Sequence, residues 1–235
     1  MNSDREAASG VRCPIFPRRG RRGVVLCHGE PPPESLLDYW LDGADLFLCA
    51  DGAGHPYTHL PRPPDVVIGD FDSLAGRIIA GRGGPLYLHA PEQDTTDAEK
   101  ALLYLVERGL NEVVLIGATG GRVDHTLYNC HLLERFADRL RVCLADPVHD
   151  VVRVGAGEAV VWQLEPGTLF SLLPLAGPAT GVTLTGAQWP LTDAVVRVGG
   201  PATVSNRVQQ PSLALSVRGG SLLVTVQRHG WPALE

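Results

Sequence analysis

Short apolar runs, often rich in β-branched residues, alternate with stretches of helical periodicity from Gly23 to about Asp146. The runs predict strands at residues 24–27, 46–49, 66–68, 86–89, 113–116 and 142–144. Apolar positions three and four residues apart predict helices at residues 97–108 and 125–137. Because strands and helices take turns, the pattern indicates a doubly wound, Rossmann-like α/β domain with a mostly parallel sheet.

The helix expected at residues 97–108 carries signals at both of its ends. Thr96 can cap its first turn, Glu99 can complete a capping box three residues later, and Gly109 follows the last apolar turn. Asp97 therefore falls in the first turn, where the helix dipole favours a negative charge or a bound anion.

After about Asp150 the pattern changes to short apolar runs separated by Gly and Pro, with no convincing helix. Strands are expected at residues 151–154, 159–164, 169–173, 182–185, 194–198, 213–217 and 222–226. Gly219-Gly220, between the last two runs, is a two-residue hairpin signal. We therefore expect an α/β domain at residues 23–147, followed by an all-β antiparallel sandwich domain or small barrel at residues 148–235.

Charge and composition narrow the classes of partner. No apolar run approaches the roughly 18 residues that span a bilayer, so no membrane partner is expected. The net charge of -6 argues against a protein that binds duplex nucleic acid, whose footprint is usually basic. Lys100 is the one lysine among 20 basic residues, which excludes the lysine-dependent phosphate loop. An anionic substrate would need a metal ion or a few placed arginines.

The five cysteines are odd in number and widely spaced, with no Cys-x-x-Cys pair. We interpret them as reduced, mostly buried thiols of a cytoplasmic protein. Residues 1–22 are rich in Arg, but the apolar run that follows is too short for a signal peptide. A disordered basic leader is therefore expected at residues 1–22.

Four polar motifs follow successive predicted strands, at the sheet edge where ligands of α/β proteins collect. They are Ala50-Asp51-Gly52, Asp70-Phe71-Asp72-Ser73, the segment from Gln93 to Asp97, and the segment from Gly117 to Arg122 with Asp124-His125. Each motif alone can be an ordinary turn. Their occurrence at four strand ends favours one shared binding site.

The acidic residues of these motifs indicate a metal site. Carboxylates brought together repel one another by roughly 1 kcal/mol per pair at 4 Å in water, and by more when partly buried, so they need a cation. Mg²⁺ prefers hard oxygen ligands and commonly shares them with substrate phosphates. We expect Asp70, Asp72 and Asp97 to bind Mg²⁺ and to form the catalytic group.

The glycine-rich motif suits a polyphosphate. Gly120 and Gly121 allow backbone N–H groups to approach phosphate oxygens, and Arg122 offers a planar fork of donors. Asp51 and Asp124 are candidates to orient a ribose or an adenine. The alternative for Arg122 and Asp124 is a surface ion pair near a helix start.

Two further residues of the first domain and three of the second leave alternatives open. His125 can contact the ligand or be a helix N-terminal residue without a chemical role, and Lys100 can reach phosphate or be solvated. Trp189 can stack on a flat or cationic heterocycle, with Ser205 and Asn206 supplying hydrogen bonds. The alternative for these three is a core Trp and a turn.

Taken together, these residues resemble the thiamine pyrophosphokinase family over about residues 24–227. The ordered motifs are Ala-Asp-Gly, Gly-Asp-Phe-Asp-Ser, Gln-Asp-x-Thr-Asp with Lys three further on, Gly-Gly-Arg-x-Asp-His, Ser-Leu-Leu-Pro-Leu, Leu-Thr-Gly-x-x-Trp-x-Leu and Val-Ser-Asn. One departure is Ala53-Gly54-His55, where the family usually has Gly-Ala-Asn.

The resemblance implies a nucleotide-binding α/β domain followed by a β-sandwich, working as a homodimer. It implies a Mg²⁺-dependent transfer of pyrophosphate from ATP to the thiamine hydroxyl, whose proton an unliganded carboxylate oxygen could accept. Thiamine is expected at the subunit interface, against Trp189, Ser205 and Asn206. The full set expected to bind ATP is Asp51, Gly52, Gln93, Asp94, Thr96, Lys100, Gly120, Gly121, Arg122, Asp124 and His125.

Two other interpretations stay open on the sequence. The first is another metal-dependent Asp-x-Asp enzyme, such as a haloacid-dehalogenase-like phosphatase, although Lys100 followed by an apolar helix fits that pattern poorly. The second is a catalytically weak thiamine- or nucleotide-binding protein with the same fold, for which the loop at His55 is the support.

Overall fold

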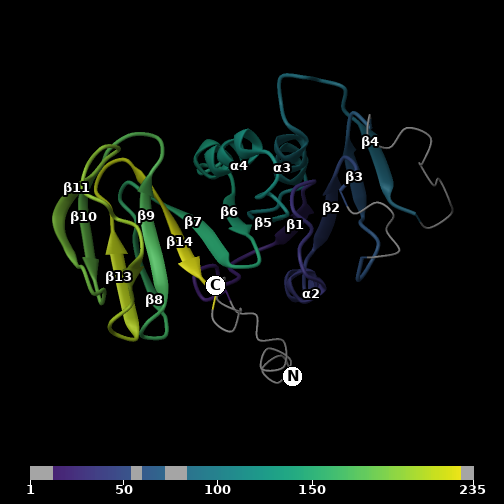
Figure 1. Ribbon diagram of the computed structural model, residues 1–235. Helices are drawn as coiled ribbons and strands as arrows, with labels where there is room; N and C mark the ends of the chain where they lie inside the picture. Colours follow the sequence, from purple (N-terminus) through teal and green to yellow (C-terminus); the bar gives the residue numbers. More distant parts are fainter. Residues whose placement is uncertain (1–12, 54–59, 72–83, 229–235) are drawn as a thin grey trace. The chain divides into compact units, whose positions relative to one another are not determined.

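The computed structural model describes residues 13–53, 60–71 and 84–228. Contacts divide the chain into two compact units. The first unit contains residues 18–132 and 136–147, whereas residues 148–228 form the body of the second, which also includes residues 133–135 and 13–17. Figure 1 gives the labels of the helices and strands.

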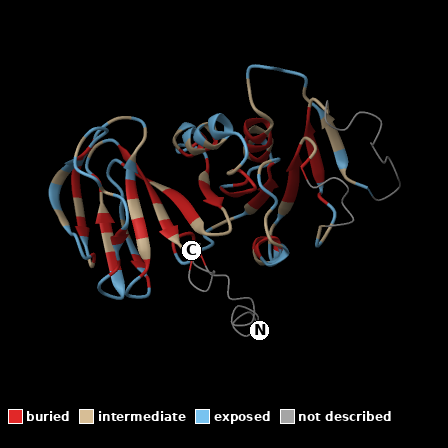
Figure 2. Ribbon diagram, viewed as in Figure 1, coloured by how far each residue is buried: buried red, intermediate tan, exposed pale blue. Residues whose placement is uncertain are grey.

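The described strands of the first unit form a parallel sheet in the order β6-β5-β1-β2-β3-β4. Their bounds are Arg22–Leu26 for β1, Leu46–Ala50 for β2, Val66–Gly69 for β3, Leu86–His89 for β4, Glu112–Ile116 for β5 and Arg141–Ala145 for β6. The prediction of a parallel α/β sheet is confirmed. All of β5 is buried, and Figure 2 shows the inner strands of this sheet in red.

Three described helices accompany this sheet: α2 (Glu34–Leu41), α3 (Asp97–Glu107) and α4 (Val123–Arg135). The start of α3 is as predicted, because the Thr96 side chain accepts a hydrogen bond from the Glu99 amide. Helix α2 was not predicted from the sequence. This helix has only 8 residues and follows three prolines, but it buries one face that includes Leu36, Leu37 and Trp40.

A buried carboxylate joins the amino ends of the central strands. Glu112, at the start of β5, has a side chain only 1% exposed and accepts hydrogen bonds from the Arg22 guanidinium and the Arg19 amide. It also pairs with Arg141 at the start of β6. Burial of one charge is tolerated here because several donors surround it.

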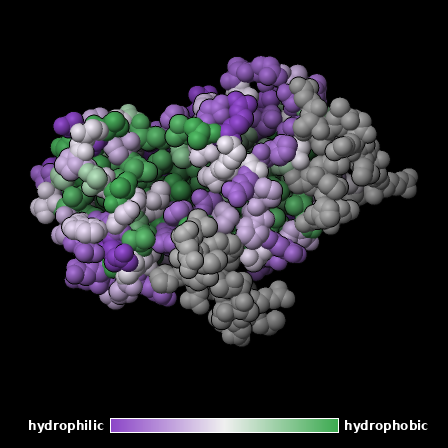
Figure 3. Space-filling view, viewed as in Figure 1, coloured by the Kyte–Doolittle hydropathy of each residue, from purple (hydrophilic) through white to green (hydrophobic). Residues whose placement is uncertain are grey.

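The described strands of the second unit pair antiparallel in two sets of four, as expected for a sandwich. One has the order β12-β9-β14-β7 and the other β11-β10-β13-β8. The bounds are His149–Gly155 for β7, Ala159–Gln163 for β8, Leu169–Pro174 for β9, Ala179–Thr185 for β10, Leu191–Val196 for β11, Asn206–Arg207 for β12, Ser212–Ser216 for β13 and Ser221–Gln227 for β14. The short strand β12 was missed. Figure 3 shows apolar side chains, in green, on the visible face of this unit.

The expected hairpin at Gly219-Gly220 is wrong. Strand β13 pairs with β8 and β10, whereas β14 pairs with β7 and β9, so the two glycines connect the two sheets. Gly219 exchanges backbone hydrogen bonds with Thr180, at the start of β10. A Cβ on Gly220 would lie 2.3 Å from the Pro178 carbonyl oxygen, so glycine permits a close approach here.

Part of the segment expected to be a disordered leader, residues 1–22, is packed in the structure. Cys13, Ile15 and Phe16 are buried, Arg18 pairs with Asp45, and β1 itself begins at Arg22. Residues 1–12 of the expected leader lie outside the described residues. Among the described helices, none combines the length and the apolar character needed to cross a bilayer.

Candidate active site

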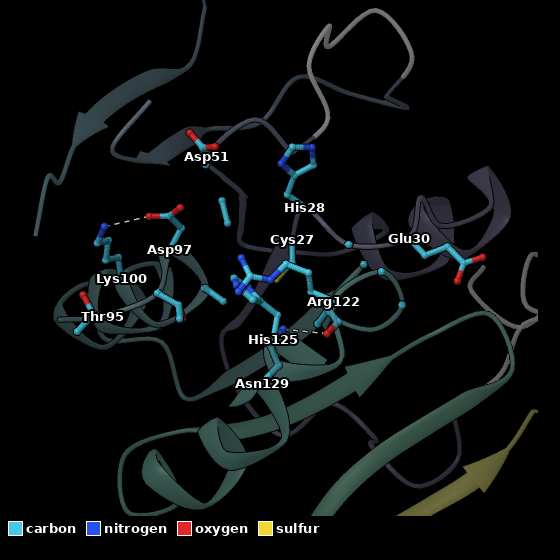
Figure 4. Close-up of a pocket in the computed structure, with 18 of the residues that line it drawn as sticks. Cys27, His28, Glu30, Asp51, Thr95, Asp97, Lys100, Arg122, His125 and Asn129 are labelled. Atoms are coloured by element: carbon cyan, nitrogen blue, oxygen red, sulfur yellow. Dashed lines mark hydrogen bonds and ion pairs between the residues drawn. The ribbon is translucent and has the colours of Figure 1, made fainter. Parts of the chain in front are cut away.

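A pocket of about 760 Å³ lies at the carboxyl ends of the parallel strands in the first unit. Loops that follow β1, β2, β3, β4 and β5 line it together with the first two turns of α3 and α4, and Figure 4 shows the principal side chains. The lining residues are 27–30, 50, 51, 70, 93, 95–98, 100, 117, 118, 120–122, 125 and 129. All four polar motifs of the sequence therefore contribute to one pocket.

Three carboxylates converge at one end of this pocket. Asp51, Asp70 and Asp97 each place one oxygen within 4.8 Å of the others. Three hard oxygen donors at this spacing fit a divalent cation of the Mg²⁺ type. Asp51, expected to orient a ribose or an adenine, thus lies with the carboxylates expected to bind metal, whereas Asp72 is outside the described residues.

The backbone that holds these carboxylates has unusual conformations. Asp51 follows β2 with φ of 48°, and its amide donates to the Ile68 carbonyl of β3 at 2.7 Å. A Cβ on Gly69 would lie 3.0 Å from the Asp51 Cα, so β3 has a glycine where Asp51 approaches. Phe71 has φ of 63° and stacks on His89 with 5.8 Å between ring centroids. Such conformations cost about 1–3 kcal/mol each and are concentrated at functional sites.

Lys100 is buried against the acidic group rather than solvated. Its Nζ donates to Asp97 Oδ1 at 3.0 Å and to the Ala90 carbonyl at 2.8 Å, and its side chain is 7% exposed. Burial raises the pKa of Asp97, the bond to Lys100 opposes that rise, and the charges of Asp51 and Asp70 add to it. The carboxylates therefore repel one another despite the ammonium.

The segment before α3 contributes an amide to the same end of the pocket. Gln93 Nε2 donates to Asp70 Oδ2 at 3.2 Å, which joins two of the expected motifs. Thr95 and Thr96 line the pocket, but Asp94 is exposed and Gly52 also lies outside the lining. These last two were expected to bind ATP.

The loop after β1 forms part of the wall and was missed by the sequence analysis. Gly29 donates to the Gly117 carbonyl at 2.8 Å, and Glu30 donates to the Thr119 carbonyl at 3.0 Å. A Cβ on Gly29 would lie 2.3 Å from the Gly117 oxygen, so the two loops are in close contact. His28 and Glu30 line the pocket beside this contact. Both residues follow a predicted strand, and that position could have identified them as site residues.

Arg122 and Asp124 form the surface ion pair that was the alternative to ligand binding. Two hydrogen bonds of 2.5 and 3.1 Å join their side chains, which are 72% and 63% exposed. The bond to Arg122 helps to lower the pKa of Asp124 to about 2. Arg122 and His125 line the pocket, whereas Asp124 does not.

Asn129 is a further lining residue that was not predicted from the sequence. Its buried amide donates to the Ala118 carbonyl at 2.8 Å and so fixes the glycine-rich loop from α4. Within that loop Gly120 and Gly121 have φ of 78° and 61°, which glycine adopts without strain.

The residues expected to bind thiamine lie together in the second unit. Asn206 Nδ2 donates to the Trp189 carbonyl at 2.8 Å, and Asn206 Oδ1 accepts from the Trp189 amide at 3.2 Å. Ser205 has φ of 56°, and its amide donates to the Ser171 hydroxyl. Trp189 is 55% exposed, so it is not the core Trp of the alternative interpretation. The Asn206 amide holds this loop in place.

Models of known families match both parts of the chain. Residues 37–144 match the family described as "Thiamin pyrophosphokinase, catalytic domain", and residues 160–222 match "Thiamin pyrophosphokinase, vitamin B1 binding domain". A thiamine pyrophosphokinase of Arabidopsis thaliana is 30% identical over 218 residues, which cover 82% of this chain and 80% of that relative. A thiamine pyrophosphokinase of Bacillus subtilis is 28% identical over 165 residues, covering 68% and 77%.

Solved structures share the fold. A thiamine pyrophosphokinase structure from Bacillus subtilis aligns with a TM-score of 0.77 at 24% identity, covering 88% of this chain and 99% of that one. A thiamin pyrophosphokinase from Geobacillus thermodenitrificans aligns with a TM-score of 0.74 at 26% identity, covering 89% and 98%. The yeast thiamin pyrophosphokinase structure has a TM-score of 0.77 at 16% identity, covering 90% and 87%.

Proposed function

Because this chain belongs to the thiamine pyrophosphokinase family, we propose that it transfers pyrophosphate from ATP to the hydroxyl of thiamine, giving thiamine diphosphate and AMP. The observation that carries the proposal is the convergence of Asp51, Asp70 and Asp97 in one pocket. Transfer of this kind depends mainly on in-line positioning and charge neutralisation, which carboxylates with a bound cation can supply.

We assign the metal site to Asp51, Asp70 and Asp97, with Asp72 as a proposed fourth ligand outside the described residues. The oxygen donors and the mutual repulsion felt by Asp97 fit a hard divalent ion. A bound Mg²⁺ would neutralise the triphosphate charge and polarise the phosphate that is attacked. Lys100 orients Asp97, and Gln93 orients Asp70.

The proton of the thiamine hydroxyl has to leave as the oxygen attacks the β-phosphorus. We propose that a carboxylate oxygen of the acidic group that is not engaged by the metal accepts it. AMP is the leaving group, and the remaining lining residues hold the nucleotide in line. These lining residues include the expected ATP-binding residues Thr96, Gly120, Gly121, Arg122 and His125.

We propose that residues 148–235 form the thiamine-binding and dimerisation domain and residues 23–147 the catalytic domain of a homodimer. The exposed ring of Trp189 supports this role, because a positive thiazolium is attracted to an aromatic face. The match to a vitamin B1 binding domain over residues 160–222 supports the same assignment. Light scattering on the purified protein tests the homodimer, and a monomer at working concentration would contradict it.

The five cysteines are unbridged in the structure, which supports a cytoplasmic location. Burial, together with the charge of Asp97, raises the pKa of Cys27 to about 12. This pocket thiol therefore stays neutral and has no part in the proposed chemistry.

One incubation tests the reaction. Purified protein is mixed with Mg²⁺, ATP and thiamine, and the nucleotide and thiamine products are separated by chromatography. We expect AMP and thiamine diphosphate in equal amounts. ADP with thiamine monophosphate would instead indicate a monophosphate kinase. Free phosphate without thiamine turnover would indicate a phosphatase, and binding of thiamine or ATP without any product would indicate a binding protein.

A further inference from the structure

The described lining of the pocket contains a fourth carboxylate, that of Glu30, apart from the three that converge. In Figure 4 Glu30 lies on the opposite side of the view from Asp97 and Lys100. Its backbone is fixed, because the Glu30 amide donates to the Thr119 carbonyl at 3.0 Å. The pocket thus has a negative group at each end, and only one end has the spacing of a metal site.

The Glu30 carboxylate lies over the glycine-rich loop. A Cβ built on Gly120 would lie 2.8 Å from Glu30 Oε2 and 2.7 Å from its Cβ. A carboxylate at this place repels phosphate oxygens. Among the described lining residues, none near Glu30 belongs to a cluster that could hold a metal ion and offset this repulsion. The triphosphate therefore belongs at the end with the three aspartates, and the uncharged nucleoside belongs at the Glu30 end.

The sheet topology independently favours a nucleoside at this place. Strand β1 lies between β2 and β5, so the direction of strand succession reverses between β1 and β5. Ligands of doubly wound folds bind in the crevice at such a reversal. The two loops that border this crevice follow β1 and β5, and they are the loops that Glu30 and Gly120 belong to.

The other candidates for ribose binding are engaged elsewhere. Asp51 lies with the acidic group, and Asp124 makes two hydrogen bonds with Arg122 and does not line the pocket. Among the described lining residues, Glu30 is then the carboxylate available to a nucleoside. A carboxylate has two acceptor oxygens and no donor, which matches the two donor hydroxyls of a ribose.

We propose that the Glu30 carboxylate accepts hydrogen bonds from the 2′ and 3′ hydroxyls of the ATP ribose and so selects ribonucleotides. This assignment rests on the proposed function, because it takes ATP as the substrate. It also assigns Gly120 to the nucleoside, whereas the sequence predicted that Gly120 contacts the phosphates.

Direct binding tests the assignment without turnover. Dissociation constants for ATP and for 2′,3′-dideoxyATP, both with Mg²⁺, are measured by calorimetry on the wild type, Glu30→Ala and Glu30→Gln. Glu34→Ala is the matched control, because Glu34 is an exposed carboxylate four residues away that does not line the pocket. The Glu30 side chain is exposed, so its replacement leaves the fold intact.

We expect the wild type and Glu34→Ala to prefer ATP by about tenfold or more, which is about 1.4 kcal/mol. Glu30→Ala should bind both nucleotides within about twofold of each other, with Glu30→Gln in between. An unchanged preference in Glu30→Ala would overturn the assignment. The assignment would also be overturned if Glu30→Ala lost the discrimination between ATP and inosine triphosphate but kept the preference for ATP over 2′,3′-dideoxyATP, because Glu30 would then contact the base. A wild type that binds no ATP would overturn the proposed function itself.

Discussion

Replacing Gly69 with Ala tests how closely β3 and Asp51 are packed. The Gly69 φ is not in the left-handed region, so the backbone accepts Ala there. The added Cβ would lie 3.0 Å from the Asp51 Cα and Cβ and 3.2 Å from its nitrogen. Ordinary contacts of this kind begin near 3.4 Å, so Asp51 has to shift by about 0.4 Å. The obstructing atoms include backbone, which cannot rotate away.

The expected cost has two parts. Overpacking of this kind typically destabilises by about 1–3 kcal/mol, or about 2–4 °C in Tm for each kcal/mol in a chain of this size. Because Asp51 carries one of the three converging carboxylates, its shift should also weaken metal binding and turnover. A misplacement of about 1 Å can cost about 100-fold in rate, so about tenfold is expected here.

Thermal unfolding and steady-state kinetics at several Mg²⁺ concentrations measure both effects. Gly155→Ala is the control, because the three atoms nearest its added Cβ belong to the end of the Arg153 side chain and not to backbone. The variant Gly69→Ala should require more Mg²⁺ for half-maximal rate than the wild type. Wild-type stability and Mg²⁺ dependence in Gly69→Ala would refute the packing argument.

Three further predictions follow from single side chains. The pKa of Asp97 is raised, so Asp97 ionises at higher pH than an ordinary Asp. The affinity for Mn²⁺ should therefore fall about tenfold for each pH unit below that pKa. Lys100→Met removes an interaction that lowers the pKa of Asp97 and should move this loss of affinity to higher pH. Trp189→Ala should raise the KM for thiamine about 3–10-fold, in line with the strength of a cation–π contact, and leave the KM for ATP unchanged. Glu112→Gln should lower the free energy of unfolding by about 2–3 kcal/mol, less than the 3–5 kcal/mol of a fully buried pair because Arg141 is 34% exposed.

Each of these has a contradicting result. A Mn²⁺ affinity that is flat with pH, or a decline that stays in place in Lys100→Met, would contradict the account of Asp97. Equal changes in both KM values would show that Trp189 acts on the fold and not on thiamine. An unchanged urea midpoint in Glu112→Gln would show that its arginine partners are satisfied by solvent.

The sequence predicted most of the fold because its signals are local. Strands β1 to β6 coincide with short apolar runs of strand length, and α3 carries its own cap at Thr96. The missed elements α2 and β12 are short, so periodicity cannot register in them. The hairpin predicted at Gly219-Gly220 was wrong because a glycine pair also occurs where two backbone segments approach closely. That approach depends on residues such as Pro178, which are distant in sequence.

The sequence predicted which motifs form the site, but not which role each residue has within it. Strand ends identified Asp70, Asp97 and Gln93 together, because parallel strands bring their carboxyl ends to one edge. The position of Asp51 beside two of these carboxylates depends on its positive φ and on Gly69, which a motif does not encode. Glu30 was missed because the loop after β1 carries no recognisable motif, although it follows a strand as the others do.

Binding of Mn²⁺ to the protein alone, followed by electron paramagnetic resonance, tests the central claim that Asp51, Asp70 and Asp97 form one metal site. Asp138→Asn is the control, because Asp138 is a 79% exposed carboxylate that does not line the pocket. We expect the wild type and the control to bind Mn²⁺ equally, and Asp51→Asn and Asp70→Asn to bind it at least about tenfold more weakly. Wild-type affinity in both of these variants would contradict the account.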